Sequence, residues 1–115
     1  MNPDAQQHLP LSPATLHVLL ALTEGELHGY GIMLEVARQS GGQYKIGPGT
    51  LYDNLKKLLS ARLVEESQPA SPETGTRRAF QITTLGLEVL TAEVERLSGV
   101  LRHARRSIRL AERRS

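Results

Sequence analysis

The chain has 115 residues, of which 39% are hydrophobic and 23% are charged, and its formal net charge at pH 7 is +2. This length supports one domain with a single hydrophobic core. The absence of cysteine excludes disulfides, thiolate metal sites and cysteine nucleophiles. No apolar segment approaches the ~20 residues that span a bilayer, and residues 1–10 do not resemble a signal peptide. We therefore expect a cytoplasmic protein that has no membrane partner.

The first part of the sequence predicts an arm and then a buried helix. Residues 1–11 contain two prolines and no periodic apolar pattern, which predicts a flexible arm. Ser12 is a favourable N-cap, and Pro13 fits the first position of a helix that Gly25 would end. This helix is apolar on several sides, so we expect it to be central. Its apolar residues include Leu16, Val18, Leu19, Leu20 and Leu22.

Two further helices follow, joined by a short connection. The first of them is predicted to begin near His28 or Gly29 and to end before Gly41. Residues 43–46 then lead to a helix over residues 48–60. Two helices joined by a short turn form a helix-turn-helix, in which the second helix lies in the major groove of DNA.

The helix over residues 48–60 has one apolar face and one polar, basic face. Leu51, Leu55 and Leu58 follow helical spacing on one side. The opposite side carries Gly49, Thr50, Asp53, Lys56, Lys57 and Ser60. By itself the pattern fits an ordinary surface helix as well as a recognition helix. The elements around it favour the recognition helix.

A β-hairpin is predicted after this helix. Residues 63–68 and 77–83 contain β-branched and aromatic residues, and a turn-rich stretch separates them. A hairpin in this position is the wing of a winged-helix domain. Arg77 and Arg78 lie where a wing meets the duplex, so they are candidates for phosphate or minor-groove contacts. Arginines in a hairpin are also often only solvated.

The C-terminal segment has the most regular apolar pattern in the chain. Its apolar residues alternate spacings of three and four, which is the pattern of a coiled-coil seam. They are Leu87, Leu90, Val94, Leu97, Leu101, Ala104 and Ile108. A second copy of the chain is the simplest partner for such a seam, so we predict a homodimer. The alternative is that the whole seam packs on the chain's own first helix.

Charge is distributed unevenly along this segment. Glu88, Glu93 and Glu95 lie in its first half, whereas the region from Arg102 to Ser115 holds six arginines and one glutamate. Antiparallel packing of two copies would bring opposite charges together, whereas parallel packing would bring like charges together. The basic end could instead contact phosphates, or be a solvated helix end that complements its own macrodipole.

Nothing in the sequence indicates catalysis. The four histidines lack metal-ligand spacing, and no Walker-type loop or nucleophile elbow is present. The histidines are His8, His17, His28 and His103. We therefore expect no enzyme activity, no metal and no cofactor. The rival to DNA binding is a winged-helix module that binds a protein or, through the basic tail, a membrane surface.

Several motifs together resemble the PadR family of bacterial transcriptional regulators, in particular its short subfamily with a single C-terminal helix. They are His28-Gly29-Tyr30, Gly49-Thr50-Leu51-Tyr52 with Leu55, Lys56 and Leu58, Leu63-Val64, and Phe80-Gln81-Ile82-Thr83 with Gly86. The resemblance implies a winged helix-turn-helix homodimer that binds inverted repeats, commonly as a repressor, with Tyr52 at a phosphate. It also allows a small-molecule effector, which the sequence does not identify. The family usually has glycine where this chain has Arg62, so this arginine either adopts a left-handed conformation or the helix exits differently.

These expectations define a mainly helical fold with a small β-hairpin. Residues 1–11 form the arm, residues 12–83 the winged helix-turn-helix DNA-binding domain, and residues 84–115 a dimerisation helix with a basic tail. The expected DNA contacts are Thr50, Tyr52, Asp53, Asn54, Lys56, Lys57, Arg77 and Arg78. Among them, Thr50, Asp53 and Asn54 would read base edges, and the lysines and arginines would contact phosphates.

Overall fold

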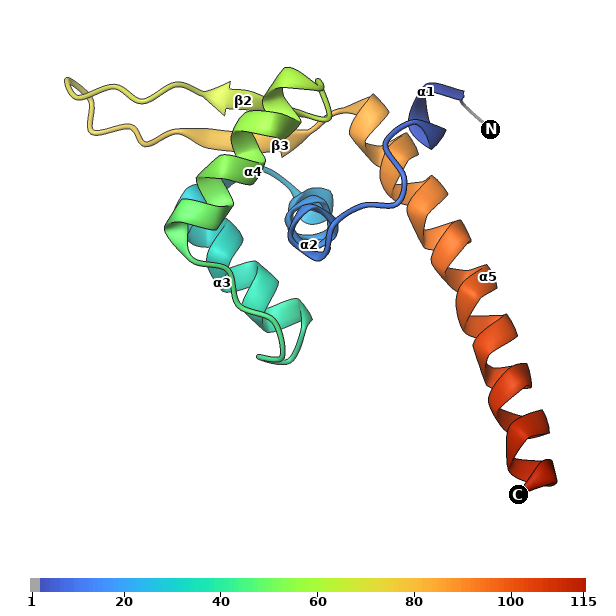
Figure 1. Ribbon diagram of the computed structural model, residues 1–115. Coiled ribbons are helices and arrows are strands. Elements are labelled where there is room, and N and C mark those ends of the chain that lie inside the picture. Colours follow the sequence, from blue (N-terminus) through green and yellow to red (C-terminus); the bar gives the residue numbers. More distant parts are fainter. Residues whose placement is uncertain (1–2) are drawn as a thin grey trace.

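In the computed structural model of the chain, which describes residues 3–115, helix α2 (Pro13–Ala21) lies at the centre of the fold (Figure 1). Ser12 caps it as predicted, since its hydroxyl accepts a hydrogen bond from the Thr15 N–H. A single 3-10 turn, η1 (Leu22–Glu24), continues it. The prediction that this helix is central is confirmed, because three longer helices pack against it. They are α3 (Gly29–Gln39), α4 (Pro48–Ser60) and α5 (Thr84–Arg114).

The predicted hairpin is confirmed, and it belongs to a sheet of three antiparallel strands. The strands are β1 (Leu27–His28), β2 (Val64–Gln68) and β3 (Ala79–Ile82), in the order β1-β3-β2. Phe80 of β3 is completely buried and lies opposite Leu27 on one side and Glu66 on the other. Strand β1 was not predicted, because two residues are too few to show an alternating pattern.

The prediction of a flexible arm is wrong for residues 3–11. Helix α1 (Pro3–Gln6) packs against α5, and only 1% of Ala5 is exposed. The backbone N–H of Leu11 donates a hydrogen bond of 2.7 Å to the carboxylate of Glu93 on α5. Both contacts depend on a helix remote in sequence, so the local pattern of the arm did not reveal them. The first two residues of the predicted arm lie outside the described residues.

Glu93 is the one buried charged side chain among the described residues, and it has two partners. Only 1% of it is exposed. Its carboxylate accepts hydrogen bonds from the Arg96 guanidinium and from the Leu11 N–H. The hydrogen bond from Arg96, supported by that from Leu11 and by the charge of Arg96, holds the pKa of Glu93 below its usual value. Glu93 therefore remains ionised and keeps the arm on α5.

Helix α4 ends in a Schellman motif with an arginine at the left-handed position. Arg62 has a φ of 61°, which settles the two alternatives raised by its sequence. The N–H of Leu63 donates to the carbonyl of Leu58, and the N–H of Arg62 donates to that of Leu59. An L-residue in this conformation is strained, because its Cβ approaches the following carbonyl oxygen.

The start of α5 is fastened to the end of α4. The hydroxyl of Thr83 donates to the Arg62 carbonyl at 2.7 Å and accepts from the Gly86 N–H at 3.0 Å. Gly86 packs so closely on the carbonyl of Leu63 that a Cβ at this position would collide with it. These contacts fix the corner where the chain leaves α4 and later returns from the hairpin.

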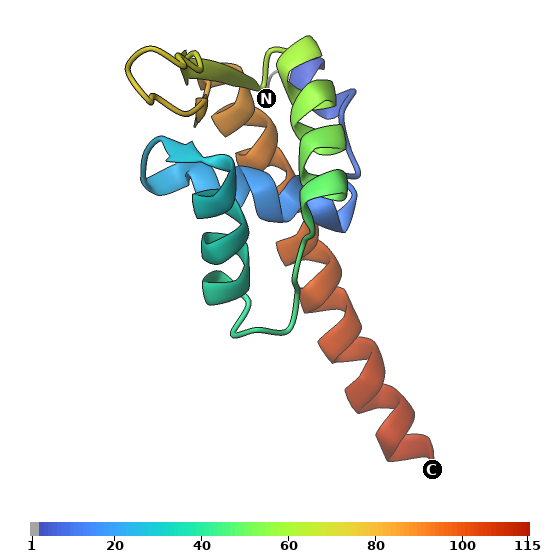
Figure 2. The ribbon, with the colours of Figure 1, turned by 90° about the vertical axis from the view of Figure 1, so that its left-hand side faces the viewer.

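Only the first part of α5 packs on its own domain. Its buried residues are Gly86, Val89, Leu90, Ala92 and Glu93. Beyond them the helix runs away from the domain (Figure 2), and Leu101 and Ile108 are more than half exposed. The alternative in which the whole seam packs on the first helix is therefore wrong. None of the helices among the described residues has the length and apolar character needed to cross a membrane.

Arg62→Gly should raise the free energy of unfolding by roughly 0.5–1 kcal/mol. The substitution removes about 1–2 kcal/mol of left-handed strain and adds about 0.4–1 kcal/mol of unfolded-state entropy. Arg62→Ala is the matched control, because it retains Cβ and should leave stability unchanged. Urea-induced unfolding measures both variants, and equal stabilities would contradict the strain at position 62.

Glu93→Gln should destabilise the protein most at pH 7, and the difference from the wild type should shrink as the pH falls below the unfolded pKa of Glu93. A carboxyl group whose pKa is lowered by folding stabilises the protein at pH values above its unfolded pKa of about 4.3. That contribution disappears as the pH falls through the folded pKa. Thermal unfolding of the wild type and the variant from pH 7 to pH 3 measures the difference, and a difference independent of pH would disprove the role of the charge.

Candidate nucleic-acid interface

Helix α4 buries one face and presents the other to solvent. Leu51, Leu55 and Leu58 are buried against the domain, as their spacing predicted. The exposed side carries Thr50, Tyr52, Asp53, Lys56 and Lys57. Pro48 occupies the first turn. The helix packs against both α2 and α3, so its polar face has a fixed direction.

Lys56 and Lys57 are free cations on this face. Both side chains are exposed, and neither forms an ion pair in the part of the chain that the structure describes. With Asp53 and Ser60 they line an open hollow on the side of α4. Asp53 lies within one helical turn of both lysines, so its charge lowers the positive potential of this face. The net charge of the three side chains remains positive.

Asn54 is the predicted contact whose side chain is directed elsewhere. Its Oδ1 accepts a hydrogen bond of 2.9 Å from the Thr15 hydroxyl on α2. Its Nδ2 donates to the Thr50 carbonyl at 2.8 Å. An asparagine that reads an adenine needs both of these groups. The arrangement therefore argues against the predicted base-reading role of Asn54.

The two arginines of the wing have different environments. Arg78 donates to the Glu66 carboxylate at 2.5 Å, and its guanidinium lies 5.0 Å from the centre of the Phe80 ring. Arg77 is exposed and has no ion pair among the described residues. Both residues lie just before β3, and Arg78 is the one whose guanidinium meets Glu66 of β2. Of the predicted pair, only Arg77 presents a free charge.

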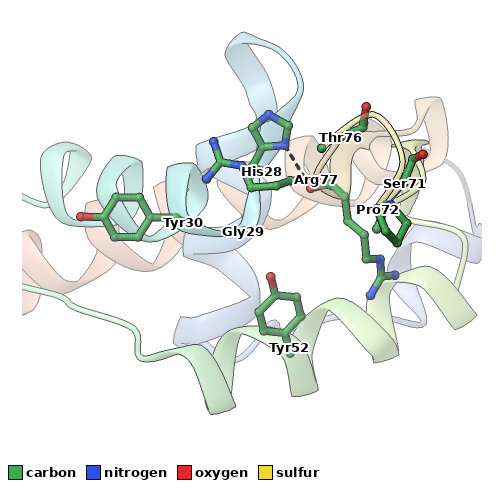
Figure 3. Close-up of a pocket in the computed structure, with 11 residues that line it drawn as sticks. His28, Gly29, Tyr30, Tyr52, Ser71, Pro72, Thr76 and Arg77 are labelled. Atoms are coloured by element: carbon green, nitrogen blue, oxygen red, sulfur yellow. Dashed lines mark hydrogen bonds between the residues drawn. The ribbon is translucent and has the colours of Figure 1, made fainter.

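A hollow of about 510 Å³ lies between the wing, α3 and α4 (Figure 3). Tyr52 rises into it from α4, and its hydroxyl lies so close to Gly29 that a Cβ there would collide with it. Arg77 lines the same hollow from the wing. The Nδ1–H of His28, the last residue of β1, donates to the Arg78 carbonyl at 3.1 Å and so holds the start of α3 to the wing.

His28, Gly29 and Tyr30 also line this hollow, although sequence reasoning assigned them no place in the interface. Their helical pattern indicated only the start of α3. The sequence does contain two motifs that point to this place, His28-Gly29-Tyr30 and Gly49-Thr50-Leu51-Tyr52. In the structure the two motifs meet where the Tyr52 hydroxyl packs on Gly29.

The residues of the predicted seam of α5 differ in burial. Leu87, Val94, Leu101 and Ile108 are each between 43% and 58% exposed and recur every seven residues. Leu90, in contrast, belongs to the chain's own core, so its predicted place in a dimer interface is wrong. Leu97 and Ala104 are half-buried. Periodicity reports an apolar side of a helix and does not distinguish an internal partner from an external one.

Comparison with known proteins identifies the family. Residues 18–92 match the sequence profile of the transcriptional regulator PadR-like family. This chain belongs to the PadR-like family. The family is one of transcriptional regulators and not of enzymes, as the sequence predicted. Among the described residues, no group of three or more His, Cys, Asp or Glu side chains could hold a metal ion.

Two relatives in sequence extend the comparison. Transcriptional regulator Rv3488 of Mycobacterium tuberculosis is 30% identical over 87 residues, which cover 76% of this chain and 78% of that protein. A 37.1 kDa protein in transposon TN4556 of Streptomyces fradiae is 39% identical over 89 residues, or 75% of this chain. The match spans only 24% of the length of the Streptomyces protein.

A solved PadR-like structure shares the fold. Bacillus subtilis PadR in complex with operator DNA superposes with a TM-score of 0.64 at 21% sequence identity. The match covers 74% of this chain and 48% of the Bacillus chain. At this identity, the similarity establishes the winged-helix architecture that this PadR-like chain adopts.

Proposed function

We propose that this PadR-like chain is a homodimeric repressor that binds an inverted-repeat operator through α4 and the wing. The observation that carries the proposal is the hollow shared by Tyr52 of α4 and Arg77 of the wing. It combines a hydroxyl donor with a free guanidinium beside the exposed lysines of α4. The PadR of Bacillus subtilis, which has this fold, forms a complex with operator DNA.

Phosphate contacts would supply most of the affinity. Lys56, Lys57 and Arg77 are exposed and form no ion pair within residues 3–115, so neutralising phosphates with them breaks no ion pair described there. Base edges would be read by Thr50 and Asp53 on the same exposed face. A carboxylate such as Asp53 accepts from a cytosine amine or orients a neighbouring lysine, because phosphates repel it.

The exposed side of α5 is the proposed dimer interface. Leu87, Val94, Leu101 and Ile108 form an apolar stripe, and a groove at its start is lined by Ala5, Thr91 and Ala92 among others. Burial of an aliphatic side chain contributes about 1.5–3 kcal/mol, so the stripe supplies enough free energy for association. A second copy supplies an equal stripe by symmetry.

Charge complementarity supports antiparallel pairing. Beside the apolar stripe runs a column of charges with the same seven-residue spacing, namely Glu88, Glu95, Arg102 and Arg109. A two-fold axis between Ser98 and Gly99 would place Glu95 opposite the partner's Arg102. It would also place Glu88 opposite the partner's Arg109. Parallel pairing would instead put each charge beside its own copy.

Repression would follow from occupancy of the promoter. Two copies of α4 would enter successive major grooves about 34–36 Å apart. A dimer held there excludes other proteins from the same DNA. A ligand that changed the distance between the two copies of α4 would release it.

Selection of DNA by the wild-type protein from a random-sequence duplex library tests the proposal. An inverted repeat should be enriched, with half-sites about one helical turn apart. Failure to retard any duplex at moderate salt would contradict DNA binding and leave a protein partner as the alternative. A single, unrepeated site would contradict the dimeric arrangement.

Removing a free cation should lower both the affinity and its salt dependence. Lys56→Ala, Lys57→Ala and Arg77→Ala should each reduce the slope of log K against log salt by about 0.9, which is the value for one phosphate contact. Arg78→Ala is the matched control, since Arg78 is already paired with Glu66. Gel-shift titrations on the selected duplex measure the slopes, and an equal loss for Arg78→Ala would contradict the assignment of Arg77.

Glu95→Arg should weaken the dimer about tenfold at low salt, because it places two arginines opposite each other in both symmetric pairs. The double variant Glu95→Arg with Arg102→Glu should restore dimerisation. Sedimentation equilibrium at low and high salt measures both. Parallel packing predicts no change for Glu95→Arg, because one like-charge pair would replace another.

A further inference from the structure

A continuous series of polar contacts connects α5 with α4 through the start of α2. We propose that Thr15 and Asn54 are positioning residues that fix the direction of α4 relative to α5, and thereby set the half-site spacing that the dimer accepts. The inference rests on the proposed function, since spacing has meaning only for a dimer on DNA. Figure 1 shows α2 lying between the other two helices.

The first part of the series joins α5 to the residue before the N-cap of α2. Arg96 holds the buried carboxylate of Glu93, and that carboxylate accepts the N–H of Leu11 at 2.7 Å. A hydrogen bond to a buried charge is among the stronger contacts available to a backbone N–H. The chain is therefore held to α5 at the point where α2 begins.

The second part joins the N-cap of α2 to the first turn of α4. The hydroxyl of Ser12 donates to that of Thr15 at 3.0 Å, which in turn donates to Oδ1 of Asn54 at 2.9 Å. The amide of Asn54 then donates to the carbonyl of Thr50 at 2.8 Å. Thr50 is a predicted base contact, so the series ends at the DNA-facing surface.

These hydrogen bonds provide a constraint that the apolar contacts do not. The leucines of α4 bury area against α2 and α3, and burial is non-directional, so it tolerates small rotations and shifts along the helix axis. A hydrogen bond weakens steeply when its distance or angle changes. Within residues 3–115, the hydrogen bond from Thr15 to Asn54 is the one that joins a side chain of α2 to a side chain of α4.

Binding to a set of duplexes with altered spacing tests the inference. The inverted repeat selected by the wild type is lengthened and shortened by one and two base pairs at its centre. Thr15→Val keeps the shape of the side chain and removes the hydroxyl. It should reduce the preference for the best spacing over its neighbours about fivefold, the effect expected of one lost hydrogen bond. Thr15→Ser retains the hydroxyl and should retain the preference.

Asn54→Ala should reproduce the effect of Thr15→Val, and the double variant should show no further loss, because both remove the same hydrogen bond. An unchanged spacing preference in Thr15→Val would overturn the inference. It would also be overturned if Asn54→Ala lost selectivity at one base pair, which would indicate a base contact.

A measurement without DNA separates failure of the inference from failure of the proposed function. Urea-induced unfolding of Thr15→Val, Asn54→Ala and the double variant forms a double-mutant cycle, which should show a favourable coupling between the two side chains, because Thr15 donates to Asn54 Oδ1. A coupling of zero would disprove the positioning contact. If the coupling is found but the wild type retards no duplex, the contact stands, and the DNA-binding function and the spacing role fail together.

Discussion

Packing of three helices around α2 is the constraint on which the rest of the domain depends. Val18 and Leu19 are fully buried, and α3, α4 and α5 each pack against this nine-residue helix. Interiors are close-packed, so a large displacement of any of the three helices would open a gap or a clash at α2. The proposed recognition helix α4 and the proposed dimer helix α5 therefore both pack on α2. If α5 pairs with a second copy as proposed, a change at that interface would reach α4 through α2.

The connection between α4 and α5 is constrained by backbone geometry as well as by packing. Arg62 accepts a strained conformation because the Schellman hydrogen bonds and the contact of its carbonyl with Thr83 leave no other exit. Gly86 lets α5 approach the Leu63 carbonyl. The wing therefore leaves the domain in a fixed direction, with Arg77 beside Tyr52. The hydrogen bonds at this corner hold Arg62 in its strained conformation and also fix the positions of the wing and of α5.

The structure separates cations that stabilise the fold from those that are free to bind. Arg38, Arg78 and Arg96 pair with the glutamates Glu35, Glu66 and Glu93. Lys56, Lys57 and Arg77 have no such partner in the described part of the chain. A free cation can neutralise a phosphate without losing an earlier contact. The difference between Arg77 and Arg78 is the ion pair that Arg78 forms with Glu66 of β2.

The sequence by itself determined helices α2 to α5, the hairpin and the polar face of α4, because these follow from local periodicity and from residues such as Ser12, Pro13 and Pro48. Only the tertiary structure decided what depends on contacts between remote segments. It placed Leu90 in the core, docked Leu11 on Glu93 and turned Asn54 toward Thr15. Periodicity shows which side of an element is apolar, but the partner of that side is set by packing of the whole chain.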